Sequence, residues 1–394
     1  MSPSRLRPFV PFAAGLLAIT AVVATVAVPV VGGSDWWNTR LRVATEPPPR
    51  MDVTPLPGSV REHWSVPGRT GQHNPVVDST VITTTAHGIV GHDPITGQER
   101  WHYQRNNVTL CDWVTVDGAV VAAFRHEGGC VDMVALDGGT GQRRWYRTAD
   151  LDADATLSAG PGVVVAGGGT RLVAFYTDTG QERWTYTRAG CGFGPPVAGD
   201  LGVAVVLSCH RQGQLLALHD LVGKDERWSV PVGGTRLSLL AANERVALYG
   251  TYQGREAVTL FDSRGAQVGA VTSPDLAAHP AADPAPDAAG PDHTVPTAST
   301  FLSTLVVWTG SHLVAVDLTR ARIRWSAPAS GPAARQTPTV VYPDDTGFVE
   351  RGPSDGQVLR RATVEGAPAG PVSGLARVGG NIVATGTNGT IMYG

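Results

Sequence analysis

The sequence predicts an all-β fold organised as a β-propeller, and two observations carry this prediction. The first is a phrase that recurs along the chain: ITGQERW, GTGQRRW and DTGQERW end at Trp101, Trp145 and Trp184, and the weaker copies VGKDERW and RARIRW end at Trp228 and Trp325. The second is the interval between phrases, which is 44, 39 and 44 residues from the first to the fourth. A repeat of roughly 40–45 residues made of short strands is typical of a propeller blade.

Composition narrows the class of protein. The chain has 48 Gly and 29 Pro, which suit many tight turns, and only 16% of its residues are charged, with a net charge of −3. No basic patch or basic run interleaved with aromatic residues occurs, so we expect no nucleic-acid partner. Lys224 is the only lysine. Together with abundant Ala, Gly, Pro and Val, this usage resembles that of GC-rich bacteria, actinobacteria in particular.

The N-terminus carries a candidate membrane segment. Residues 9–31, FVPFAAGLLAITAVVATVAVPVV, contain no charge over 23 residues, and about 20 apolar residues span a bilayer core. Arg5 and Arg7 precede the stretch, which favours a cytoplasmic N-terminus, and Trp36 and Trp37 follow it as candidate interface anchors. We predict a single-pass transmembrane helix in the cell membrane, with the rest of the chain extracytoplasmic. A cleaved signal peptide and a secreted protein are the alternative, although such apolar cores are usually ~7–15 residues long.

The other segments differ in composition. Residues 1–8 form a short cytoplasmic tail. Residues 32–58 include TEPPPRMDVTPLPG and predict an extended tether, because proline fixes φ and removes backbone donors. Residues 59–394 carry the repeats and predict the propeller. Within them, residues 272–297 are rich in Pro, Ala and Asp with almost no strand formers, which predicts a disordered insertion between blades.

The repeat unit has the pattern of four short strands. In residues 76–101, VVDSTVITTT reads as two strands, HG as a turn, IVGHD as a third strand, PITG as a tight turn and QERW as the start of the outer strand. Gly97, Gly141 and Gly180 stand where the tight turn requires a positive φ. The threonine before each glycine (Thr96, Thr140, Thr179) can bond the turn backbone.

The tryptophan of the phrase is predicted to wedge between neighbouring blades. Burying one such aromatic side chain contributes about 2–3 kcal/mol, and a tryptophan that recurs once per repeat is better explained by this structural docking than by a ligand. The docking positions are Trp101, Trp145, Trp184, Trp228 and Trp325, together with the three turn glycines.

The four cysteines predict two disulfides. Cys111 and Cys130 are 19 residues apart, and Cys191 and Cys209 are 18 apart. Each pair lies within one repeat unit, so we predict the disulfides Cys111–Cys130 and Cys191–Cys209 and an oxidising compartment. Four buried free thiols are the alternative. Neither pair has the spacing of a zinc or redox motif.

The phrase also carries a family resemblance. ALDGGTGQRRW, residues 135–145, resembles the A-x-D-x-x-T-G-x-x-x-W docking motif of PQQ-like, or quinoprotein-type, β-propeller repeats. Residues 174–184 depart from it with Tyr176 in place of the aspartate, and residues 315–325 lack the Thr-Gly pair. The resemblance covers roughly residues 59–394 and implies the fold.

Blade counting uses the Trp marks and their degenerate copies. LFDSRGAQVGAV and PSDGQVLRR are degenerate marks without Trp, and the first strand, around Trp64, is expected to supply the outer strand missing from the C-terminal unit. This arrangement predicts an eight-bladed ring, with seven blades as the alternative if residues 229–325 make only one blade. The marks are Trp64, Trp101, Trp145, Trp184, Trp228, Gly269, Trp325 and Arg360.

We predict a non-catalytic binding or scaffold module for a protein or cell-wall partner, acting in cell-envelope assembly as the similar periplasmic propeller of the outer-membrane assembly machinery does. The alternative is a PQQ-dependent oxidoreductase. The resemblance implies that such enzymes hold quinone and calcium in a central funnel. This sequence has no adjacent cysteine pair and no matching ligand set, so we expect neither PQQ nor calcium, no metal site and no catalytic residue. Trp113 and Trp308 are expected at core positions, with a place lining the funnel as the alternative, and His87 and His92 are expected at a surface turn.

Overall fold

The computed structural model describes residues 35–68, 70, 74–126, 128–277, 296–334, 338–366, 372–386 and 389–394. The predicted transmembrane segment 9–31 and most of the predicted insertion 272–297 lie outside these residues. Within the described ranges, no helix has the length and apolarity needed to cross a membrane.

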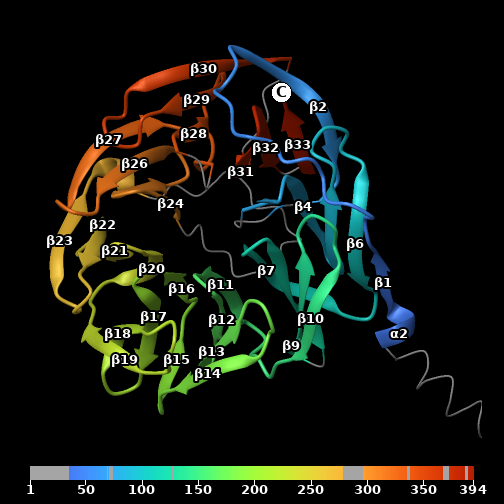
Figure 1. Cartoon of the computed structure of the whole chain (residues 1–394). Helices are drawn as coiled ribbons and strands as arrows, with labels where there is room; N and C mark the ends of the chain where they lie inside the picture. The colour runs from blue at the N-terminus through green and yellow to red at the C-terminus, as the bar shows by residue number, and fades with distance from the viewer. Residues whose placement is uncertain are drawn as a thin grey trace, which may run out of the picture.

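Successive sheets are arranged in a ring, as predicted for a propeller (Figure 1). The described strands form seven hydrogen-bonded sheets, and in the sheets made of four consecutive strands, such as β7 to β10, the first strand lies toward the centre of the ring while the last lies at its rim. The hydrophobic core is divided among the spaces between neighbouring sheets. One cluster, for example, joins Val121, Met133 and Trp145 of one sheet to Val164 and Phe175 of the next. Each sheet is therefore stabilised mainly by its neighbours.

The sheets follow the chain. The described chain begins with α2 (Asp35–Asn38), β1 (Thr39–Arg42) and β2 (Ser59–Val66). The first sheet contains β3 (Val76–Val77), β4 (Thr80–Thr85), β5 (Gly88–His92) and β6 (Glu99–Arg105), and the second contains β7 (Thr109–Val116), β8 (Ala119–His126), β9 (Gly129–Asp137) and β10 (Arg143–Thr148). The third sheet contains β11 (Thr156–Gly160), β12 (Val163–Gly168), β13 (Arg171–Tyr176) and β14 (Glu182–Thr187). The fourth sheet contains β15 (Cys191–Phe193), β16 (Val197–Gly199), β17 (Gly202–Cys209), β18 (Gly213–His219) and β19 (Glu226–Pro231). The remaining strands are β20 (Thr235–Ala242), β21 (Val246–Tyr252), β22 (Arg255–Phe261) and β23 (Gln267–Thr272), followed by the 3-10 turn η1 (Pro274–Leu276); β24 (Thr297–Phe301), β25 (Thr304–Trp308), β26 (His312–Asp317) and β27 (Arg322–Pro328); β28 (Val340–Pro343), β29 (Gly347–Arg351) and β30 (Val358–Glu365); and β31 (Val372–Val378), β32 (Asn381–Gly386) and β33 (Gly389–Tyr393).

The two ends of the chain meet in one sheet. β2 pairs antiparallel with β33, so the first strand of the ring completes the last sheet, as predicted. β2 also pairs in parallel with β30 over residues 59–61 and 363–365. These two pairings produce a seven-stranded sheet with the order β28-β29-β30-β2-β33-β32-β31. Pairing the terminal strands removes the open edges that would otherwise remain where the ring closes.

Every outer strand of the ring is bent at the same place. Its register with the preceding strand shifts one residue before the tryptophan mark; in β10, for example, Arg143 pairs with Leu136 and Trp145 pairs with Ala135. A β-bulge re-aims the side chains beside it, so the shift directs the arginine and the tryptophan of the phrase to different neighbours. The bulged residues are His63, Arg100, Arg144, Arg183, Arg227, Val268, Arg324 and Leu359.

The segment predicted as a tether is instead packed on the ring over residues 39–58. β1 adds a fifth strand outside β6, with Leu41 opposite Tyr103. After β1, the Ala44 amide donates to Thr140 O at 2.9 Å, and the Met51 amide donates to Ser79 Oγ at 3.0 Å. The chain therefore crosses the turns of neighbouring sheets before it enters β2. The proline content gave the extended conformation but no sign of these contacts.

The same segment is fastened by buried polar groups near the closing sheet. Glu350 of β29 and Arg377 of β31 are both buried. The Leu56 amide donates to Glu350 Oε2 at 3.2 Å, and Arg377 donates to the carbonyl of Thr54. Leu56 itself is buried in the cluster that contains Val60, Phe348 and Tyr393, among others. Residues 54–56 thus bridge the two halves of the seven-stranded sheet.

Both predicted disulfides form. Cys111 of β7 is bonded to Cys130 of β9, and Cys191 of β15 is bonded to Cys209 of β17, where the two residues are register partners. The second cysteine of each pair borders a hairpin, β8–β9 for Cys130 and β17–β18 for Cys209. The two bonds therefore lie on the face of the ring opposite the TG turns, which connect the third and fourth strands.

Truncating Leu56 tests whether residues 39–58 belong to the folded ring. Leu56→Ala should lower the free energy of unfolding by ~2–5 kcal/mol, because it removes a buried side chain. The matched control Val53→Ala changes an exposed side chain in the same segment and should alter it by less than about 0.5 kcal/mol. Chemical denaturation followed by circular dichroism measures both values. Equal, negligible effects would mean that the segment is a free tether.

Candidate functional site: the docking turns

The TG turn between β9 and β10 is organised by the aspartate that precedes it. Asp137 Oδ1 accepts hydrogen bonds from the Thr140 amide at 3.0 Å and from Thr140 Oγ1 at 2.8 Å, and Thr140 Oγ1 accepts from the Gln142 amide at 3.3 Å. Gly141 closes the turn with a φ of 73°. Gly97 and Gly180 have the same left-handed conformation, with φ of 71° and 65°. L side chains rarely adopt this region, so the turn favours glycine.

The tryptophan of the preceding sheet covers this glycine. Trp101 Nε1 donates to Gly138 O at 3.1 Å, and a Cβ on Gly141 would lie 2.5 Å from Trp101 Cγ. The indole therefore occupies the space that glycine leaves open and satisfies a turn carbonyl. The same donor reaches the next turn at each Trp mark, with acceptors Pro94 O for Trp64, Thr177 O for Trp145, Leu221 O for Trp184, Ser263 O for Trp228 and Pro353 O for Trp325.

A side chain from the third strand of the next sheet also packs on the docking tryptophan. It belongs to the residue just before the aspartate position of the motif, such as His92 before Asp93. Trp64 stacks with His92 and Trp184 with His219, both with ring centroids 6.3 Å apart, and Arg351 lies over the ring of Trp325. His92 is buried, and its Nε2 lies 2.8 Å from Thr83 Oγ1. The prediction of a surface position for His92 is therefore wrong, because the fold uses this position for contact between sheets.

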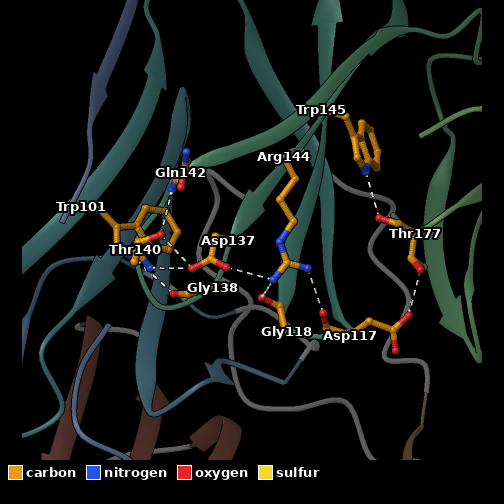
Figure 2. A network of polar contacts seen from close by, with 10 residues as sticks. All are labelled: Trp101, Asp117, Gly118, Asp137, Gly138, Thr140, Gln142, Arg144, Trp145 and Thr177. Carbon is orange, nitrogen blue, oxygen red and sulfur yellow. Dashed lines mark hydrogen bonds and ion pairs between the residues drawn. The ribbon is translucent and has the colours of Figure 1, made fainter. Parts of the chain in front are cut away.

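The bulged arginine links the turn to the inner part of its own sheet. Arg144 Nη2 lies 2.9 Å from Asp137 Oδ2 and donates to Gly118 O, while Arg144 Nη1 donates to Asp117 O (Figure 2). Asp117 Oδ2 also accepts from Thr177 Oγ1 of the next sheet at 2.9 Å. Figure 2 shows how this network runs from Thr140 through Arg144 to Thr177. The charged groups of the phrase thus bind the protein itself.

Departures from the motif are matched by changes in their neighbours. Tyr176 replaces the aspartate in β13, and the bulged Arg183 lies over its ring at 4.7 Å in place of an ion pair. In β23, Gly269 stands at the tryptophan position and faces Ala321, which has a φ of 50° at the glycine position of the next turn. A smaller pair therefore replaces the Trp–Gly pair at this junction.

Arg360 stands at the tryptophan position of β30 for a different reason. In the same seven-stranded sheet β2 pairs with β33, and no turn connects these two strands because they are far apart in the sequence. The Arg61 and Gly394 amides and carbonyls bond each other at 3.1 Å in place of a turn. A docking tryptophan would have no TG turn to cover there.

The turn aspartates are held in their charged form. Burial acts to raise the pKa of Asp137, but hydrogen bonds from Arg144 and Thr140 outweigh it and lower the pKa below 3.8. Burial also acts to raise the pKa of Asp93 and of Asp317, but hydrogen bonds lower both. Thr96 and Ile95 donate to Asp93, and Arg320 and Arg324 donate to Asp317. The docking turns therefore depend on ionised carboxylates.

Trp113 and Trp308, two tryptophans that lie off the repeated phrase, pack in or against core clusters. Trp113 is buried in the core and Trp308 is half-buried against a core cluster, so neither is set out to stack on a ligand. Among the described residues, no group of three or more His, Cys, Asp or Glu side chains lies close enough to hold a metal ion.

One groove lies at the rim between two sheets. It has a volume of about 310 Å³ and is lined by β10, β13 and β14 residues and by the loop after β10. Arg171 Nη2 pairs with Asp150 Oδ2 across it at 2.8 Å. Its lining includes Arg147, Val173, Phe175 and Glu182, among others. The groove is open and partly apolar, which suits a surface contact better than an enclosed small molecule.

Substituting the turn glycine separates backbone cost from the loss of docking. Gly141→Ala should lower the free energy of unfolding by ~1–2 kcal/mol for the positive φ and by a further ~1–3 kcal/mol for the collision with Trp101. Gly162→Ala is the matched control, since Gly162 has a φ of 68° but open space around its Cβ position. Thermal and chemical denaturation compare the two variants. Equal losses would show that the indole contact contributes nothing.

Acidification should weaken the docking turns. Because the folded-state pKa of Asp137 is lowered, its stabilising effect is present above about pH 4 and is lost as the pH falls through the folded-state pKa. Asp137→Asn should cost ~1–2 kcal/mol at neutral pH and should show a smaller further loss on acidification. Melting temperatures of both proteins between neutral pH and pH ~2 test this. Parallel curves would exclude the carboxylate as a source of the pH dependence.

The chain is similar to one protein family and to several solved structures. A family model, PQQ_2, described as outer membrane protein assembly factor BamB, matches residues 22–268. No curated protein sequence matches the chain. Among solved structures, BamB from Moraxella catarrhalis is 14% identical with a TM-score of 0.53, covering 85% of this chain and 99% of that one.

Two further structures share the fold. The computationally designed Ika8 protein is 13% identical with a TM-score of 0.57, covering 86% of this chain and 99% of that one. The quinohemoprotein alcohol dehydrogenase ADHIIG from Pseudomonas putida HK5 is 13% identical with a TM-score of 0.52, covering 85% and 76%. At these identities the likeness concerns the fold alone. The family match, in contrast, spans more than half of the sequence and includes the best copies of the docking motif, and the chain therefore belongs to the PQQ_2 family of BamB-type β-propellers.

Proposed function

We propose that this protein is a membrane-tethered, extracytoplasmic β-propeller that acts as a non-catalytic binding or scaffold module, with a role in cell-envelope assembly. The observation that carries the proposal is the use of the repeated phrase. Its aspartate, arginine and tryptophan bind neighbouring turns of the same protein, as Asp137, Arg144 and Trp145 do. The ring is thus a rigid support, and its loops remain for a protein or cell-wall partner.

Eight blades are the division of the ring that we favour. In the seven-stranded sheet, β30 and β2 pair in parallel, whereas all the other strand pairs are antiparallel. Dividing it there gives one unit that ends in β30 and another that runs from β31 to β33 and ends in β2. Each of these outer strands carries the same register shift. The seven sheets then correspond to eight repeating units.

Two features of the chain, the apolar stretch 9–31 and the two disulfides, support the proposed location. The apolar stretch 9–31, with Arg5 and Arg7 before it, supports a single-pass anchor with a cytoplasmic N-terminus. The two disulfides support an oxidising compartment for the ring. Cleavage of the apolar stretch and secretion of the ring is the alternative location, and the two differ in whether residues 9–31 persist in the mature protein.

The two flat faces of the ring offer different surfaces to a partner. One carries the TG turns, and residues 44–56 cross part of it, where Pro47 lies against Gly139 and Met51 against Gly379. The other carries the hairpins between second and third strands and both disulfides. The assembly-factor description of the family supports a protein partner. Crosslinking from each face identifies the face that binds it.

Photo-crosslinking in cells tests the binding function. A photoreactive residue at Ala86 probes the hairpin between β4 and β5, and one at Ile95 probes the TG turn of the same sheet; both positions are exposed. A binding module should give an adduct of defined mass from one face, identified by mass spectrometry, while the other position serves as the matched control. Identical adduct patterns from both positions would indicate non-specific proximity and contradict a defined binding face.

Addition of PQQ and Ca²⁺ to the purified full chain tests the enzymatic alternative. A scaffold should show neither a change in melting temperature nor a new quinone absorbance. Quinone absorbance together with dye-linked oxidation of an alcohol or sugar would overturn the proposal.

A further inference from the structure

We propose that the exposed side of β1 rests on the lipid surface, so that the ring stands with its rim, not a flat face, toward the membrane. This inference rests on the proposed function, in which residues 9–31 cross the membrane.

The first argument is the apolar surface beside the anchor. Trp37 is 69% exposed, Leu41 43% and Val43 45%. Leu41 in β1 and Val43 directly after it are two residues apart, the spacing that places side chains on one side of an extended chain. α2 and β1 lie beyond β6 at the outer rim (Figure 1). Tryptophan and aliphatic side chains gathered next to an apolar segment are typical of a membrane interface.

The second argument is reach. Three residues, 32–34, separate Val31 from Asp35, the first residue of α2. Four Cα steps span at most ~14 Å, and the headgroup region on each side of the bilayer is about 5–8 Å thick. A membrane segment that ends near Val31 therefore keeps α2 and the start of β1 at the lipid surface or just beyond it.

The third argument is that β1 is not free to move relative to the ring. It pairs with β6 from Thr39 to Arg42. Before it, the Asn106 amide donates to Asn38 O at 3.0 Å, and after it the Ala44 amide donates to Thr140 O at 2.9 Å. The anchor is thus connected to a strand that is part of the folded ring, and the direction of β1 determines how the ring faces the membrane.

Charge favours lipid over a second protein strand as the occupant. Arg40 and Arg42 alternate with Leu41 and therefore lie on the other side of β1, where both are exposed and Arg42 reaches Glu99 at 3.4 Å. Arginine keeps its charged group at the phosphates while its stem lies against apolar surface. A strand of four residues with two arginines is also a poor template for strand addition, because short charged edges oppose it. In this orientation both flat faces of the ring stay accessible to partners.

The test uses the full-length protein in liposomes of phosphatidylcholine and phosphatidylglycerol. Val43→Cys labelled with the environment-sensitive fluorophore NBD should lose most of its fluorescence when lipids carrying a headgroup nitroxide are included. Val222→Cys is the matched control, because Val222 is 72% exposed on the turn between β18 and β19, far from β1 around the ring (Figure 1). All four native cysteines are in disulfides, so the label is selective. Leu41→Cys provides a second labelled position if one variant misfolds.

Carbonate extraction of the same liposomes separates the two proposals. Quenching at 43 but not at 222, in protein that resists extraction, supports the rim contact. Protein that resists extraction but shows no quenching at 41 or 43 overturns the rim contact and leaves the membrane anchor intact. Equal quenching at 43 and 222 also overturns it, because the ring would then have no fixed side toward the lipid. Protein released by carbonate overturns the anchor and, with it, the inference.

Discussion

The contact between a tryptophan and the TG turn of the next sheet is the constraint on which this structure depends. Trp101 covers Gly141 and donates to Gly138 O, and the same contact joins Trp145 to the turn at Gly180. At five junctions the indole fills the space beside a turn glycine, and each of these glycines (Gly97, Gly141, Gly180, Gly265 and Gly356) has a positive φ. One geometric requirement therefore links the backbone of one sheet to a side chain of its neighbour, and its repetition around the ring fixes the spacing of the sheets.

The irregular junctions show how the ring accommodates exceptions. Gly269 and Ala321 form a small pair where a Trp–Gly pair would stand. Arg360 faces the place where the two ends of the chain meet and no TG turn exists. There, β2 pairs with both β33 and β30, and residues 54–56 are fastened to Glu350 and Arg377. The closing sheet is therefore stabilised by strand pairing and by the N-terminal segment in place of docking.

The same few contacts within the repeat recur around the ring, which makes a propeller of the PQQ_2 family a rigid framework for its loops. The charged side chains of the repeat, such as Asp137 and Arg144, are engaged within the protein, so the motif contributes to the contacts that hold the ring together. Functional differences among rings of this fold must then arise from loops, rim strands and added segments. In the proposed arrangement, the added segment, β1 with residues 44–58, connects the ring to the membrane anchor and sets the orientation of the ring.

The sequence by itself determined the all-β ring, the position of the docking motif, the pairing of the first strand with the last and both disulfides. These features are local or periodic: a glycine that requires positive φ, a tryptophan every 39 to 44 residues and cysteines within one repeat. Only the tertiary structure decided that residues 39–58 pack on the ring, that His92 is buried against Trp64 and that Ala321 faces Gly269. These contacts join residues far apart in the chain, or depend on which neighbour fills a space. No propensity or spacing reports them, because their energy comes from a partner that the fold alone supplies.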